Sequence, residues 1–233
     1  MPKEKMKMKE NSQAHLQPTF FIDSDAPQVI GFAGRITKGI HTDIEKAIKL
    51  FYAVRDEIYY DPYAIDPNPE SLRASAVLHK RSGFCVTKAI LLAAAARVVK
   101  IPSRLGFADV RNHLSSGRLR QLMQTDVFVF HGYTELFLEN RWVKATPAFN
   151  LSLCEKAGIK PLEFNGKSDS ILHEYDQAGK QHMEYLRDRG QFSDFPYKLM
   201  FATWKQYYPQ FYSDSFNAIG GDFEEEVSAE RKG

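Results

Sequence analysis

The sequence of 233 residues predicts an α+β protein in which a central buried helix packs on an antiparallel sheet. The first observation is the run from Cys85 to Lys100, which is rich in Ala and Leu and contains no Gly or Pro. Its few charged residues do not share one face, and a helix that is apolar almost all round is a buried one. The second observation is the stretch from Asp126 to Leu138, which starts as a continuous apolar run typical of a strand covered on both faces.

A second strand is expected directly after this one. Residues 139–141 predict a turn, and Trp142 to Thr146 returns antiparallel until Pro147 ends the strand. Another strand is predicted over Arg104 to Val110, just after the proline that stops the long helix. The order is therefore a helix that begins with a cysteine, followed by strands.

Other elements are predicted from caps and apolar spacing. Thr42 to Glu45 is a capping-box pattern, and apolar residues at helical spacing continue from there to Ile58. A short strand is expected over Thr19 to Ile22. Further helices are expected over residues 70–80, 118–123, 152–158, 176–189 and 196–208.

The composition indicates one domain with two polar ends. We expect residues 1–17 to be a disordered or lead-in tail, residues 18–212 to be the domain, and residues 213–233 to be a polar C-terminal tail. Apolar residues make up 43% of the chain, which is enough for a sizeable core.

Charge and cysteine content exclude several classes of protein. The 31 basic and 29 acidic residues nearly balance, so we expect neither a nucleic-acid nor a membrane partner. The N-terminus lacks the apolar segment of a signal peptide, and no run reaches the roughly 18 apolar residues of a membrane span. We therefore expect a cytoplasmic protein, in which the two cysteines stay reduced. Its oligomeric state is not predicted.

Motifs for metals and nucleotides are missing from the sequence. It contains no HExxH, no paired CxxC, no GxGxxG and no Walker A pattern. We therefore expect no metal and no cofactor.

Two residues are candidates for catalysis. Cys85 lies in the first turn of the buried helix, where free N–H groups and the helix dipole favour a thiolate, although a free cysteine is also a common core residue. His131 lies in the middle of the strongest strand, where a lone histidine is most often part of the core. Paired with a thiol, however, a histidine can take and return its proton.

A third group should orient the imidazole, and the returning strand is the place to look for it. Residues across a hairpin lie about 5 Å apart, which brings Ala145 to Ala148 roughly opposite His131. This stretch contains no carboxylate, and the polar side chain that it offers is Thr146.

Two segments carry a resemblance to a known family. Gly83-Phe84-Cys85, opening a helix that closes with Ile101-Pro102-Ser103-Arg104, resembles the nucleophile segment of the transglutaminase-like superfamily. The stretch from His131 to Glu135, followed by Arg141 to Pro147, resembles its second motif. The resemblance covers about residues 44–150, and the sequence just beyond is similar to a bacterial subgroup.

The resemblance implies a papain-like core with extra C-terminal helices, Cys85 as nucleophile and His131 as base. The family's usual Asp falls at Thr146, whose hydroxyl can accept a hydrogen bond from the ring but brings no charge. Asn150 could orient the ring as an amide does in Cys-His-Asn enzymes, and these two alternatives stay open. Weaker candidates for this role are Asp109, His113 and Asp126.

The implied chemistry is acyl transfer from a peptide or from a small amide or ester. The thiolate attacks the carbonyl, backbone N–H groups at the helix start stabilise the oxyanion, and His131 protonates the leaving amine. Water then gives hydrolysis and an amine gives transamidation. The alternatives are a non-catalytic binding module with the same fold, as the missing Asp allows, and an interaction scaffold that uses the aromatic C-terminal helices.

Overall fold

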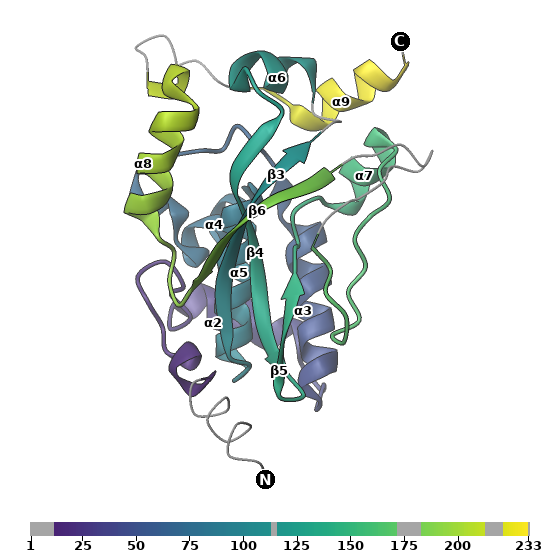
Figure 1. Ribbon diagram of the computed structural model, residues 1–233. Helices are drawn as coiled ribbons and strands as arrows, with labels where there is room; N and C mark the ends of the chain where they lie inside the picture. Colours follow the sequence, from purple (N-terminus) through teal and green to yellow (C-terminus); the bar gives the residue numbers. More distant parts are fainter. Residues whose placement is uncertain (1–11, 113–115, 172–182, 213–220, 233) are drawn as a thin grey trace.

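A computed structural model describes residues 12–112, 116–171, 183–212 and 221–232. Its main sheet contains β3 (Ser103–Asn112), β4 (Val127–Leu138), β5 (Arg141–Ala145) and β6 (Met183–Phe192). The strands are antiparallel and follow the order β5-β4-β3-β6 (Figure 1). The predicted α+β architecture is confirmed.

Helix α5 (Cys85–Val98) is the centre of the fold, and 12 of its 14 residues are buried. It packs against β3 and β4 on one side and against three helices on the others. These are α2 (Pro27–Ile36), α3 (Asp43–Glu57) and α4 (Ala74–Lys80). The all-round apolar sequence of α5 is therefore explained by neighbours on every side.

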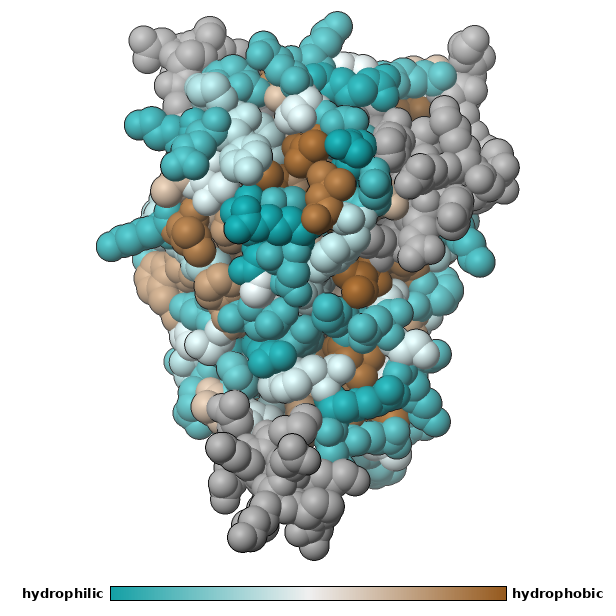
Figure 2. Space-filling model, viewed as in Figure 1, coloured by the Kyte–Doolittle hydropathy of each residue, from teal (hydrophilic) through white to brown (hydrophobic). Residues whose placement is uncertain are grey.

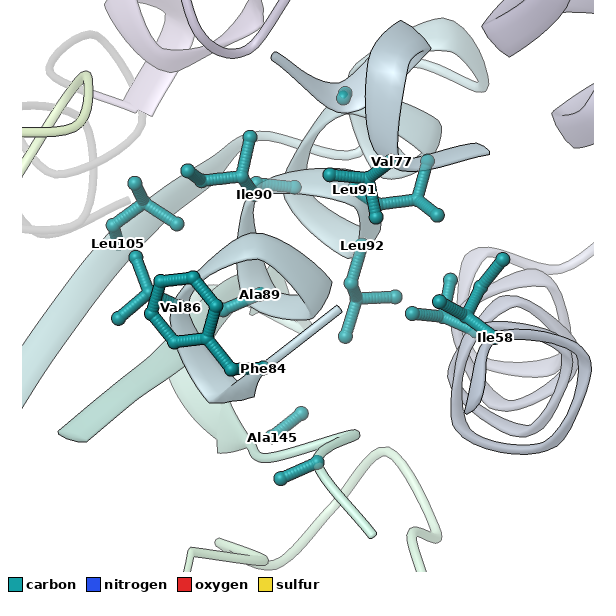
Figure 3. Close-up of a cluster of buried hydrophobic side chains, with 14 of the residues drawn as sticks. Ile58, Val77, Phe84, Val86, Ala89, Ile90, Leu91, Leu92, Leu105 and Ala145 are labelled. Carbon is teal, nitrogen blue, oxygen red and sulfur yellow. The ribbon is translucent and has the colours of Figure 1, made fainter. Parts of the chain in front are cut away.

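The apolar side chains of α5 point in different directions, each to a different layer. Leu91 lies beside Val77 of α4, and Leu92 points towards Ile58 at the end of α3 (Figure 3). All four are almost completely buried. Full burial of such a side chain contributes about 1.5–3 kcal/mol, so these contacts fix the helix and its first residue in place.

Lys88 connects α5 to the end of α3. The side chain is fully buried, and its Nζ donates to the carbonyls of Arg55, at 2.9 Å, and of Ile58. These carbonyls end α3 just before β1 (Tyr59–Tyr60), which pairs in parallel with β2 (Ser82–Gly83). These hydrogen bonds close the end of α3 and hold β1 beside the first turn of α5.

This lysine makes stability depend on pH. Burial lowers the pKa of Lys88 from 10.5 to about 7, so above pH 7 the unfolded chain binds one more proton than the folded chain. The free energy of unfolding should therefore rise by roughly 2 kcal/mol between pH 7 and pH 9 relative to that of a Lys88→Met variant. Urea denaturation of both proteins at several pH values measures this difference, and parallel curves would contradict it.

The remaining helices lie around this core. They are α6 (Gly117–Met123), α7 (Leu151–Ala157), α8 (Tyr197–Tyr207) and α9 (Phe223–Lys232), with short 3-10 turns η1 (Ala14–Leu16), η2 (Pro69–Leu72) and η3 (Pro209–Tyr212). The expected helices near residues 43–58, 70–80, 118–123, 152–158 and 196–208 are confirmed. The cap at Thr42 is present, because its side chain accepts the N–H of Glu45.

Two predicted elements are wrong. Residues 183–189, expected as part of a helix, belong to strand β6, while residues 172–182 lie outside the described residues. Long side chains give this stretch helical propensity, but pairing with β3 overrides it. The stretch from Thr19 to Ile22 is a turn and not a strand, because its hydrogen bonds close on themselves between these two residues.

Helix α9 lies in the region expected to be a polar tail. Its acidic side chains dock on basic ones from other elements, with Glu226 on Arg118 at 3.1 Å and Glu224 on Lys156 at 3.1 Å. Phe223 is buried at its start. A chain end with little apolar content is thus held by ion pairs and one aromatic anchor.

Figure 2 shows how hydrophobic residues are distributed over one face of the molecule. On the face drawn in Figure 2, hydrophobic residues form small groups among hydrophilic ones. None of the described helices combines the length and the apolar character needed to cross a bilayer.

Candidate active site

Cys85 is the first residue of α5, and a local cap fixes that turn. Thr87 Oγ1 accepts the Phe84 N–H at 3.0 Å and donates to the Phe84 carbonyl at 3.1 Å. A Cβ at position 83 would lie 2.4 Å from this oxygen, so the cap requires Gly83. Cys85 is a free, partly buried thiol.

His131 follows directly after a β-bulge in β4. Ala108 of β3 pairs with His131, but Val110 pairs with Phe128, so β4 has one extra residue in between. The extra residue falls at Phe130, whose φ of 61° is unusual for a residue with a side chain. A bulge changes the direction of the side chain that follows it, and the side chain that follows this bulge is that of His131.

An ion pair holds this bulge. The Phe130 N–H donates to Asp109 Oδ1 at 3.2 Å, and the guanidinium of Arg189 binds the same carboxylate at 2.8 Å. Asp109 and Arg189 come from β3 and β6, so all three strands meet at this point. The carboxylate of Asp109 supplies the hydrogen bond that the ladder loses at the bulge.

Two aromatic side chains satisfy the next backbone groups of β4. The Val129 N–H donates to the Tyr208 hydroxyl at 2.7 Å, and that hydroxyl donates to the Val127 carbonyl at 2.9 Å. Trp204 Nε1 donates to the Val129 carbonyl at 3.0 Å. The strand that carries His131 is thus supported by residues from the C-terminal part of the chain.

The structure brings Cys85 and His131 to one cavity. A hydrogen bond from the backbone of Gly132 reaches the thiol of Cys85. A Cβ added at Gly132 would lie 2.9 Å from the Cα of Val86, so β4 touches the first turn of α5 immediately after the histidine. The two segments that sequence reasoning paired are therefore neighbours in space.

Gly132 offers a test of this close approach. In a Gly132→Ala variant the methyl group must push β4 away from α5, because the atom it meets is backbone and cannot rotate aside. We expect a loss of about 1–3 kcal/mol in the free energy of unfolding, together with a slower reaction at Cys85. Denaturation in urea and thiol labelling measure the two effects, and Gly34→Ala, which meets no atom within 4 Å, is the control. An unchanged variant would mean that β4 and α5 are not in contact.

The thiol is neutral at rest. Burial raises the pKa of Cys85 to about 11, and backbone hydrogen bonds from Gly132, Val86 and Cys85 itself lower it by less. The helix start was expected to favour a thiolate, but desolvation raises the pKa by more than the backbone hydrogen bonds lower it. A group that removes the proton is needed for this thiol to react.

The cavity at Cys85 has a volume of about 60 Å³ and is lined mainly by apolar residues. Tyr60 of β1 and Phe223 of α9 contribute to its walls, and sequence reasoning identified neither of them. Burial, together with the nearby Cys85, raises the pKa of Tyr60 well above 10. A two-residue strand and a short acidic helix leave no periodic signal that could have revealed them.

Thr146 follows the last residue of β5 and is only 2% exposed. Its N–H donates to the carbonyl of Ser170 at 2.8 Å. Within the part of the chain that the structure describes, its buried hydroxyl has no hydrogen-bond partner. Burying a hydroxyl without a partner lowers the stability of the fold by about 1–3 kcal/mol. A hydrogen bond to another group would recover this loss.

Asn150 is also buried, but both polar atoms of its side chain have partners. Oδ1 accepts the Tyr60 N–H at 2.9 Å, and Nδ2 donates to Ser152 Oγ at 2.7 Å. Asn150 therefore holds the strand of Tyr60 next to the cavity.

Of the weaker candidates for orienting the imidazole, two form ion pairs with arginines. The carboxylate of Asp109 is engaged by Arg189 and the bulge, and Asp126 pairs with Arg111 at 3.3 Å. His113 lies outside the described residues.

Comparison with known protein families gives one match. A family model described as the transglutaminase-like superfamily matches residues 30–147, just over half of the chain. None of the curated proteins matches.

Two solved structures resemble the fold. One is a "putative cysteine protease" from Cytophaga hutchinsonii, with 16% identity, a TM-score of 0.46, and coverage of 76% of this chain and 53% of that one. The other is a "putative protease" from Parabacteroides distasonis, with 15% identity, a TM-score of 0.37, and coverage of 57% of this chain and 26% of that one. The present chain thus spans about half, or less, of these proteins.

Proposed function

Because the chain belongs to the transglutaminase-like superfamily, we propose that it transfers acyl groups from a peptide, or from a small amide or ester, through the thiol of Cys85. The observation that carries this proposal is the cavity that Cys85 and His131 line together. A thiol at a helix start beside an imidazole is the arrangement that nucleophilic catalysis requires.

In the proposed reaction, His131 removes the proton as Sγ attacks the carbonyl carbon. An S–C bond forms, and the oxyanion receives hydrogen bonds from backbone N–H groups at the start of α5. The imidazolium then protonates the leaving amine or alcohol, which departs and leaves a thioester on Cys85. Water or an amine attacks this thioester, returns a proton through His131 and frees the thiol.

Thr146 is our candidate for the group that orients His131. It occupies the position of the family's carboxylate, and its buried hydroxyl has capacity to accept the ring N–H. A neutral hydroxyl stabilises an imidazolium less than a carboxylate does, so we expect a slower enzyme than one with Asp. Asn150 remains the alternative, although its amide already holds Tyr60 and Ser152.

The proposal requires a reduced thiol, and both cysteines are free. We therefore expect the protein to act in a reducing compartment such as the cytoplasm.

Capture of the thioester tests the proposal. The protein is mixed with 4-nitrophenyl acetate, release of nitrophenol is followed, and the acylated peptide is identified by mass spectrometry. We expect a rapid first turnover and an acetyl group on Cys85. The control variant Cys154→Ser should keep the adduct, since Cys154 is a buried residue of α7 and burial raises the pKa of its thiol to about 12. No adduct, or one that persists in Cys85→Ser, would overturn the proposal.

The same experiment addresses a second candidate, a binding module without turnover. Two observations favour it: the raised pKa of Cys85 and the missing carboxylate at Thr146. A binding module would give no adduct, yet an apolar ligand in the cavity would change the fluorescence of Trp204 in its wall.

A further inference from the structure

The cavity beside Cys85 is lined mainly by apolar side chains. Leu119 and Met123 of α6 face it, together with Val110 of β3, Phe128 of β4 and Phe149. Except for Phe128, which is partly buried, each of these side chains is at most 6% exposed. The described lining contains no Asp, Glu, Lys or Arg. A ligand group in this space meets hydrocarbon on most sides.

The polar atoms of two lining residues are committed elsewhere. The Tyr208 hydroxyl is engaged by the backbone of Val127 and Val129, and Trp204 Nε1 donates to the Val129 carbonyl. These aromatic residues therefore offer ring faces to the cavity and no free donor or acceptor. Besides these two aromatic residues, the described lining carries the thiol of Cys85, the imidazole of His131, the hydroxyl of Tyr60 and the amide of Asn112.

The volume limits what can enter. A cavity of about 150 Å³ lined by Leu, Ile and Phe binds benzene. The present cavity, at about 60 Å³, is less than half that size. Its space suits a short aliphatic chain better than an aromatic ring.

We propose that this cavity binds the acyl side chain of the substrate and selects short aliphatic acyl groups over aromatic and charged ones. This inference rests on the proposed function, because it describes the acyl group that Cys85 accepts. Leu119 and Met123 are the specificity-determining residues, since they close the cavity from α6 and take no part in the chemistry. Each methylene that enters should raise the acylation rate constant about fourfold until the space is full.

A series of 4-nitrophenyl esters tests the preference. The second-order rate constant for acylation of Cys85 is measured for acetate, butyrate, benzoate and hemisuccinate, each corrected for its hydrolysis in buffer. We expect butyrate to exceed acetate by about 15-fold, from two methylenes. Benzoate and hemisuccinate should fall at least tenfold below butyrate. Equal rates for the four esters, or a preference for benzoate or hemisuccinate, would overturn the inference.

Variants locate the preference in the cavity. Met123→Ala and Leu119→Ala enlarge it, so the ratio of benzoate to butyrate should rise at least tenfold in each. Met123→Leu conserves volume and should keep the wild-type order, which separates loss of fold from loss of specificity. Leu199→Ala removes an exposed residue of α8 and is the matched control. An unchanged ratio in both enlarged variants would overturn the assignment.

The two proposals fail in different ways. If no ester acylates Cys85, the proposed function is wrong and the inference falls with it. If Cys85 is acylated without preference, only the inference is wrong.

Discussion

Replacing His131 with Ala should lower the rate constant for acylation of Cys85 by about 10²- to 10⁴-fold. The reason lies in the resting thiol, whose pKa burial raises to about 11. At pH 7 only about one thiol in 10⁴ is then ionised without help, so most of the reaction depends on a base. Acylation by 4-nitrophenyl butyrate, measured by stopped flow, gives the rate constant.

The pH profile separates a base from a merely structural histidine. Without His131 the rate constant should rise tenfold per pH unit up to about pH 11, while the wild type levels off at lower pH. Added imidazole should restore part of the activity of His131→Ala. The control is His79→Ala, because His79 is exposed at the end of α4. A variant with wild-type rate and profile would show that His131 is not the base.

Replacing Arg97 with Met should lower the free energy of unfolding by about 3–5 kcal/mol. Arg97 lies in α5, is 2% exposed, and binds three backbone carbonyls. These belong to Gln17 at 2.6 Å, Ser103 at 2.8 Å and Ser193 at 2.7 Å. Methionine fills much of the same space but removes the donor from all three carbonyls, of which that of Ser103 is buried.

Urea denaturation measures this loss, with an unchanged dependence on denaturant as evidence that the unfolded state is the same. Arg187→Met is the matched control, because Arg187 is exposed on β6 and its replacement should change stability by no more than about 0.5 kcal/mol. A loss below about 1 kcal/mol in Arg97→Met would mean that the three carbonyls find other partners.

Strong local signals made much of the fold predictable from the sequence. Helix α5 and strand β4 have long apolar runs, and the cap at Thr42 is a local pattern that needs no tertiary information. The prediction for β6 was wrong because its residues favour a helix, and only pairing with β3 makes it a strand. The bulge at Phe130 was equally hidden, since Asp109 and Arg189 that hold it are far apart in sequence.

Some residues of the candidate site could be identified from the sequence, and others could not. Cys85 and His131 stand in two recognisable segments, and the structure places both at one cavity. The third group could not be chosen from the sequence, because Thr146 and Asn150 differ in surroundings that only packing determines. Tyr60 was missed because β1 is too short to have a period.

Residues beyond the family-matching part of the chain support β4, so that part does not contain all of the structure on which the site depends. The part that matches the family ends at residue 147, but β6 begins at Met183. A fragment cut to the matching part would leave β3 as an unprotected edge, which invites aggregation, and would remove the donors that brace the histidine strand. Grafting this candidate site into another scaffold would thus require the carboxyl-terminal third of the chain as well.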